Sequence, residues 1–230
     1  MKIYKVAVFP AGTEIGLEVC SSLSNQKNIK LYGLTSEEDH SYFILKNNNF
    51  LPSIEKPEFI DNLNSYIEKE QIDIFYPAHD LVLDFVALNL NKIKCKVICH
   101  DPDTIYRVRS KTNSYSLFEE YSPKSYNPGE IWSKDIEFPV YIKPDMGFGS
   151  RNNHLIKNKE QLDNLFNSGN ISSPICISEY LPGREFTVDC FTGNNGRLIY
   201  HSARSRERIK TGISVKSKTK VDKNIKNQCE

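Results

Sequence analysis

The first hundred residues alternate short apolar strand patterns with amphipathic helix patterns. Strand patterns occupy residues 5–9, 29–34, 73–76 and 96–99, and apolar residues recur at helical spacing over 13–23, 57–70 and 81–90. Strands that alternate with helices are joined by right-handed crossovers and pair in parallel. The sequence therefore predicts a Rossmann-like α/β domain over residues 1–100. Its functional loops are expected at the carboxyl ends of the strands.

From Phe138 onward the pattern changes to consecutive strands. Strand patterns lie at 139–143, 153–156, 174–179, 184–191 and 197–204, with one helix pattern at 159–166. This order is typical of an antiparallel α+β lobe, here over residues 136–230. The intervening residues 101–135 carry two short helix patterns, with Ser110 as a natural cap of the second, and then a stretch with two prolines and a glycine. We expect a helical connector there.

Composition excludes several classes of partner. The chain has 30 basic and 29 acidic residues, for a net charge of +1, which gives no broad field for nucleic acid or an anionic membrane. No apolar stretch approaches the roughly 20 residues that span a bilayer, so a cytoplasmic protein is expected.

The six cysteines lie mostly in apolar patterns without CxxC spacing, which favours buried thiols over a metal site.

The stretch FPVYIKPDMGFGSR, residues 138–151, joins an apolar strand to a glycine-rich loop. Gly147 and Gly149 let backbone N–H groups approach an anion, while Lys143 and Arg151 place positive charge at either end. The pattern favours a phosphate-binding loop, and a structural glycine turn is the alternative.

A second motif, ISEYLPGREFTVDCF, follows later in the chain. Alternation along its strand places Glu185, Thr187 and Asp189 on one polar face. Taken together, Lys-Pro-x-x-Gly-x-Gly-Ser-Arg and Glu-Tyr-Leu-x-Gly-x-Glu-x-x-Val-Asp resemble the ATP-grasp superfamily, in the branch that contains biotin carboxylase and the carbamoyl-phosphate synthase large subunit. The resemblance covers nearly the whole chain. It implies an N-terminal pre-ATP-grasp domain followed by an incomplete ATP-grasp domain.

The resemblance also implies roles for individual residues. The residues that it assigns to ATP are the phosphate contacts Lys111 and Lys143, the flap residues Gly147, Gly149 and Ser150, the adenine-reading hinge Glu179, Tyr180 and Leu181, the ribose ligand Glu185, and Lys210. Without the motifs, Lys111 would be read as a solvated surface lysine. It lies at the start of a helix pattern, where its positive charge is close to the positive end of the helix dipole and does not stabilise the helix.

The basic stretch RSRERIK lies where the family places groups near the γ-phosphate and the acyl phosphate. We therefore expect Arg204 and Arg206 to be catalytic. A nucleic-acid patch is the rival interpretation, but the stretch lacks interleaved aromatic residues. Alternation does not decide which of its side chains point inward, because strand and loop are both compatible with it.

The implied reaction uses MgATP to phosphorylate a small carboxylate and passes the acyl group to an amine. Complete family members carry a later glutamate and a Glu-x-Asn that hold magnesium, and the sequence ends at Glu230 without them. We therefore expect a C-terminally truncated chain that lacks turnover by itself and has a second copy or a complementary C-terminal fragment as its partner. The alternative is a non-catalytic nucleotide-binding protein.

Two loops of the first domain allow other functional interpretations. The loop PAGTEIG lacks the GxGxxG spacing of a dinucleotide site, which disfavours a Rossmann-type oxidoreductase. The loop PAHD offers His79 and Asp80 at the sheet edge. Asp80 as the cap of the following helix is favoured over contact of either residue with a substrate.

Overall fold

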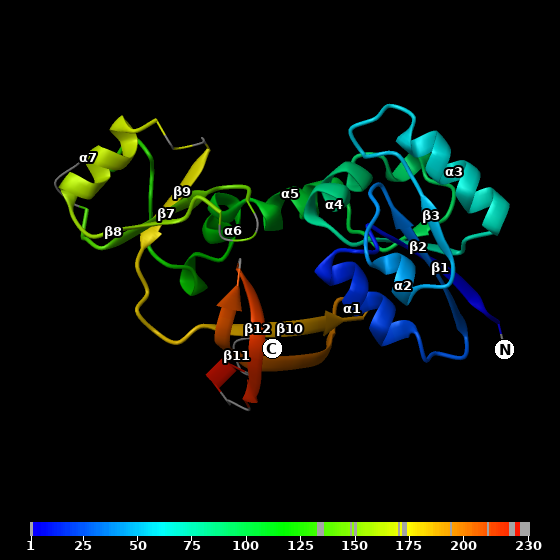
Figure 1. Cartoon of the computed structure of the whole chain (residues 1–230). Coiled ribbons are helices and arrows are strands. Elements are labelled where there is room, and N and C mark those ends of the chain that lie inside the picture. Colours follow the sequence, from blue (N-terminus) through cyan, green and yellow to red (C-terminus); the bar gives the residue numbers. More distant parts are fainter. Residues whose placement is uncertain are drawn as a thin grey trace. The chain divides into compact units, whose positions relative to one another are not determined.

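The chain divides into two compact units, Met1–Val108 and Arg109–Glu230 (Figure 1). The computed structural model describes residues 2–132, 136–147, 149, 151–169, 171, 174–193, 195–210, 212–220 and 224–225. The division between the units falls inside the segment 101–135 that the sequence indicates as a connector. Among the described residues, no helix has the length and apolar character needed to cross a membrane.

The first unit is built on a five-stranded parallel sheet with strand order β3-β2-β1-β4-β5. The strands are β1 (Tyr4–Phe9), β2 (Ile29–Thr35), β3 (Asn48–Phe50), β4 (Ile74–Pro77) and β5 (Lys96–Val97). The helices are α1 (Glu14–Leu23), α2 (Ser41–Ile44), α3 (Phe59–Glu70), α4 (Asp80–Ala87) and α5 (Pro102–Arg109), with a 3-10 turn η1 (Leu90–Lys92). This is the predicted Rossmann-like arrangement.

Both faces of this sheet are covered, because alternate residues of β1 point to opposite sides. Ala7 and Phe9 belong to a core that includes buried side chains of α3 and α4. Val6 and Val8 belong to a second core with Cys20 of α1. The continuous apolar run of β1 is therefore explained by burial on two sides.

The second unit contains two antiparallel sheets. One has the order β6-β9-β7-β8 and the other β10-β11-β12. The strands are β6 (Ser125–Tyr126), β7 (Val140–Pro144), β8 (His154–Ile156), β9 (Ile175–Glu179), β10 (Phe186–Thr192), β11 (Leu198–Lys210) and β12 (Ile213–Lys220), and the helices are α6 (Lys111–Leu117), η2 (Glu119–Tyr121) and α7 (Lys159–Asn167). Leu162 of α7 packs on Val140, Ile142 and Ile177 of the four-stranded sheet.

The predicted fold class, a parallel α/β domain followed by an antiparallel α+β domain, is confirmed. One local prediction is wrong: α4 is capped by His79, whose Nδ1 accepts a hydrogen bond from Leu81 N at 3.2 Å, and Asp80 is already its first helical residue. The imidazole Nδ1 reaches the same backbone N–H that a capping carboxylate would.

The expectation of buried thiols holds for Cys20 and Cys176, whereas Cys95 and Cys99 are only partly buried and Cys190 is exposed on β10. Cys229 lies outside the described residues.

Candidate functional site

The glycine-rich loop is fastened to the start of helix α6. Asp145 follows β7 directly and is 7% exposed. Its Oδ2 accepts a hydrogen bond from Ser110 Oγ and its Oδ1 accepts one from Thr112 N, both at 2.7 Å. Ser110 also caps α6 by accepting from Asn113 N at 3.1 Å, as predicted. One carboxylate therefore fixes the end of β7 against the first turn of α6.

Two lysines converge at this junction. Lys111 Nζ donates to the carbonyl of Asp145 at 2.9 Å and lies 3.5 Å from the carbonyl of Gly147. Lys143 Nζ donates to Tyr115 Oη at 2.7 Å and lies 5.1 Å from the centre of that ring. Lys111 and Tyr115 are one helical turn apart, so α6 presents both to the same place. The structure thus brings Lys111, Lys143 and Gly147 together.

The electrostatics of the pair favour an anion. Burial lowers the pKa of Lys111, and the neighbouring charge of Lys143 lowers it further, against the opposing effect of Asp145. Among the described residues, neither lysine has a carboxylate within ion-pair distance. Two ammonium groups that repel each other and lack an ion-pair partner gain most from a group with several negative oxygens. Phosphate has that chemistry.

The loop that follows has the backbone that the glycines allow. Gly149 adopts φ +66°, in the left-handed region that disfavours other residues. At Gly147 a Cβ would lie 3.2 Å from the ring of Pro144, so the loop turns close to the end of β7. Ser150, predicted as part of the flap, lies outside the described residues.

The Glu-Tyr-Leu segment, residues 179–181, lies at the end of strand β9, and its side chains range from half-buried to exposed. The Glu179 carboxylate accepts from Lys124 N at 2.8 Å, and Tyr180 N donates to the carbonyl of Pro139 at 3.2 Å. Glu179 is therefore engaged in holding β6 beside β9. Leu181 N donates no hydrogen bond within the described part of the chain, and Tyr180 and Leu181 are 40% and 60% exposed. Leu181 N–H is thus the backbone donor of the Glu-Tyr-Leu segment that has no partner among the described residues.

The three-stranded sheet shows which conformation the basic stretch RSRERIK adopts. The stretch is strand to its end, since β11 continues through Lys210 and pairs with β12. The Glu185 carboxylate pairs with the Arg206 guanidinium, and Arg204 contacts Asp189 at 3.2 Å. Arg206 is the more buried arginine, with 17% of its side chain exposed, and it also donates to the carbonyl of Gly212.

The predicted residues therefore form two groups of contacts. Lys111, Lys143 and Gly147 form the first, and Glu185 forms the second with Arg206. Lys210 is exposed at the end of β11. That both groups serve one nucleotide stays a prediction.

Sequence reasoning missed two residues of the first group, Asp145 and Tyr115. Tyr115 follows Lys111 by four residues in a helix pattern, and this spacing indicates that the two side chains lie on the same face of the helix. Asp145 lies inside the quoted motif, but its partners in α6 are distant in sequence, so no local pattern assigns them.

Comparison with known proteins identifies the fold. No protein-family model matches the sequence, and no curated protein matches it. Solved structures, by contrast, do match this chain. The biotin carboxylase domain of Hydrogenobacter thermophilus 2-oxoglutarate carboxylase, in complex with MgADP, ADP and bicarbonate, is 14% identical with a TM-score of 0.71 over 93% of this chain and 52% of that chain.

Two further structures agree. N5-carboxyaminoimidazole synthetase from Staphylococcus aureus, complexed with ADP, is 16% identical with a TM-score of 0.71 over 99% of this chain and 62% of that chain. The L-amino acid ligase of Bacillus licheniformis is 12% identical with a TM-score of 0.64 over 99% of this chain and 57% of that chain. The chain thus has the ATP-grasp fold, with its parallel N-terminal domain and part of its grasp domain, and spans 52% to 62% of these relatives.

Proposed function

We propose that this chain binds ATP and belongs to an ATP-dependent ligase that activates a carboxylate as an acyl phosphate and transfers the acyl group to an amine. The observation that carries the proposal is the pair of lysines at the glycine loop. Lys111 and Lys143 come from a helix start and a strand end, and among the described residues no carboxylate pairs with either. The ATP-grasp fold supplies the context in which such a pair meets a triphosphate.

In this proposal the lysines bind the phosphates and the hinge reads the base. Leu181 N–H donates to the adenine edge, while the exposed Tyr180 and Leu181 side chains cover the ring. Glu185 accepts from the ribose hydroxyls. Its pairing with Arg206 orients that carboxylate.

Transfer would proceed by positioning and charge stabilisation. A carboxylate oxygen attacks the γ-phosphorus, and the bond to the β,γ-bridging oxygen breaks, so that ADP leaves and an acyl phosphate forms. The amine nitrogen then attacks the acyl carbon, inorganic phosphate leaves, and the nitrogen gives up a proton. Arg204 and Arg206 are the groups we assign to the charge on the transferred phosphoryl group, for which each guanidinium would exchange its carboxylate partner, Asp189 or Glu185, for phosphate oxygens.

Magnesium has no ligand set among the described residues. None of their His, Cys, Asp and Glu side chains form a group of three or more that could hold a metal ion. The second candidate function is nucleotide binding without phosphoryl transfer.

Calorimetric titration with ATP tests the nucleotide site. Replacing Lys143 with Met removes one charge-assisted hydrogen bond to phosphate, so we expect the affinity to fall at least about tenfold. Lys157→Met is the matched control, because Lys157 is an exposed lysine of the same unit, and its affinity should equal that of the wild type. An unchanged affinity in Lys143→Met would overturn the assignment.

The same samples separate the two candidate functions. Adding magnesium with a panel of carboxylates and amines and measuring ADP formation detects turnover. ADP that forms only when both substrates are present supports the ligase. ATP binding without ADP formation under any condition supports the binding-only function.

A further inference from the structure

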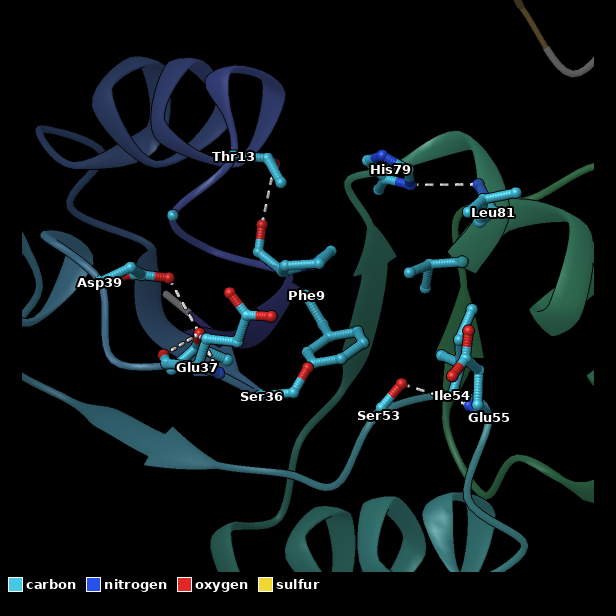
Figure 2. Close-up of a pocket in the computed structure, with 14 residues that line it drawn as sticks. Phe9, Thr13, Ser36, Glu37, Asp39, Ser53, Ile54, Glu55, His79 and Leu81 are labelled. Carbon is cyan, nitrogen blue, oxygen red and sulfur yellow. Dashed lines mark hydrogen bonds between the residues drawn. The ribbon is translucent and has the colours of Figure 1, made fainter. Parts of the chain in front are cut away.

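A cavity of about 450 Å³ opens at the carboxyl edge of the parallel sheet, within the first unit (Figure 2). It is formed by the segments that follow β1, β2, β3 and β4. Its apolar part includes Phe9, Ile54 and Val82. A cavity of this volume is large enough for a small organic molecule. The ligand position of open α/β sheets is the same edge, beyond the carboxyl ends of the strands.

The cavity is lined with negative charge. Glu37 points into it from the segment after β2, and Glu55 lies across it in the segment after β3 (Figure 2). Asp39 adds a third carboxylate beside Glu37. Among the described lining residues there is no lysine or arginine. Glu37 and Glu55 form no ion pair with any residue that the structure describes.

Asp39 is fixed in its place by the protein. Its Oδ2 accepts from Thr35 Oγ1 at 2.8 Å and its Oδ1 accepts from Ser41 N at 2.8 Å. Partial burial acts to raise the pKa of Asp39, but the hydrogen bonds from Ser41 and Thr35 outweigh it and hold the pKa below its ordinary value. A Cβ on Gly12 would come within 2.2 Å of Asp39 Cγ, so the loop after β1 is shaped around this carboxylate.

The lining of the cavity suits neither an anion nor a metal ion. Helices α1 and α4 begin at the cavity, but Gly16 N is already bonded to Thr13 Oγ1 and Leu81 N to His79 Nδ1. Acidic residues follow in both first turns, which weakens the attraction of these helix ends for anions. The carboxylates of the cavity do not form a metal-binding group, since none occurs among the described residues.

We propose that this cavity binds a small organic amine, with Glu37 and Asp39 on one side and Glu55 on the other accepting hydrogen bonds from its ammonium groups. Carboxylates on opposite sides favour a ligand with two cationic ends. Ser36 and Ser53 line the same space and provide hydroxyls for its polar atoms. That the amine is the acceptor of the activated acyl group rests on the proposed function, whereas the site itself does not.

Nuclear magnetic resonance titration of the full chain tests the site. The probes are 1,4-diaminobutane, 4-aminobutan-1-ol and 1,4-butanediol, which have similar lengths and carry two, one and no amino groups. We expect the amide signals of Gly12 and Ser36 to shift with affinities in that order. Glu37→Gln and Glu55→Gln should each weaken diamine binding about tenfold, because each removes a charged acceptor.

Glu38→Gln is the matched control. It removes the same charge from the adjacent exposed position, which does not line the cavity, and it should leave diamine binding unchanged. The proposal is overturned if no probe shifts these signals, if the diol binds as tightly as the diamine, or if Glu38→Gln weakens binding as much as Glu37→Gln.

ATP titration of the same variants keeps this inference apart from the nucleotide site. Glu37→Gln should retain the wild-type affinity for ATP, and Lys143→Met should retain that for the diamine. Normal ATP binding without any diamine binding overturns the amine site alone, and the converse result overturns the nucleotide site alone.

Discussion

At the scale of single residues, Asp145 holds the lysine site together. Its two oxygens bind Ser110 and Thr112 at the start of α6, while its own carbonyl accepts from Lys111. Asn at this position keeps the shape but has only one acceptor oxygen. We expect Asp145→Asn to lower the free energy of unfolding by about 1–3 kcal/mol at pH 7, since a buried donor then loses its partner.

The acid dependence of stability gives a second readout for Asp145. Burial acts to raise its pKa, but the hydrogen bonds from Thr112 and Ser110 prevail and place the pKa below its ordinary value of 3.8. Its contribution is therefore present above that value and is lost as the pH falls through the folded-state pKa. Urea unfolding at pH 7 and near pH 3 should show the difference between Asp145→Asn and wild type shrinking at the lower pH. Glu137→Gln, an exposed carboxylate, should show little difference at either pH.

The residues of the site differ in how far the sequence reveals them. Lys143 ends an apolar strand before a glycine-rich loop, so its position follows from local pattern alone. The pairing of Glu185 with Arg206 does not. It depends on the register between β10 and β11, which the hairpin sets and a sequence pattern leaves free.

At the scale of elements, Thr13 joins two loops at the carboxyl edge of the parallel sheet. Its hydroxyl accepts from Gly16 N at 3.1 Å and lies 2.9 Å from the carbonyl of Ala78. Thr13→Ala removes the cap of α1 and this link to the loop before α4. We expect a loss of about 1–2 kcal/mol in the unfolding free energy. Thr13→Ser keeps the hydroxyl and should lose much less, and equal losses in chemical denaturation would contradict the capping role.

The elements that the sequence predicts are those with an apolar face. Strands β1, β4 and β9 and helices α3 and α7 bury regular patterns in the cores. The missed strands have no such signal. β3 and β6 have only three and two residues, and β12, ISVKSKTK, is exposed along most of its length. Their pairing is determined by neighbouring strands, which a single-sequence pattern does not contain.

At the scale of the whole molecule, each unit has its own hydrophobic core. The two clusters of the first unit contain side chains from Val6 to Val97, and the cluster of the second extends from Tyr126 to Ile177. Folding of each unit is thus driven by burial within its own segment.

This separation predicts that residues 1–108 fold without the rest of the chain. The segment contains all five strands of the parallel sheet and the helices on both of its faces, and a domain of this size buries enough surface to be stable. We expect a single cooperative urea transition by circular dichroism, with a slope of about 1–2 kcal/mol per molar urea. A fragment of residues 1–70 is the control. This fragment lacks β4, which pairs with β1 on the side away from β2. It should not fold, because Phe75 and the α4 side chains of the core are missing. If residues 1–108 gave no cooperative transition, the folding of the parallel sheet would depend on the second unit.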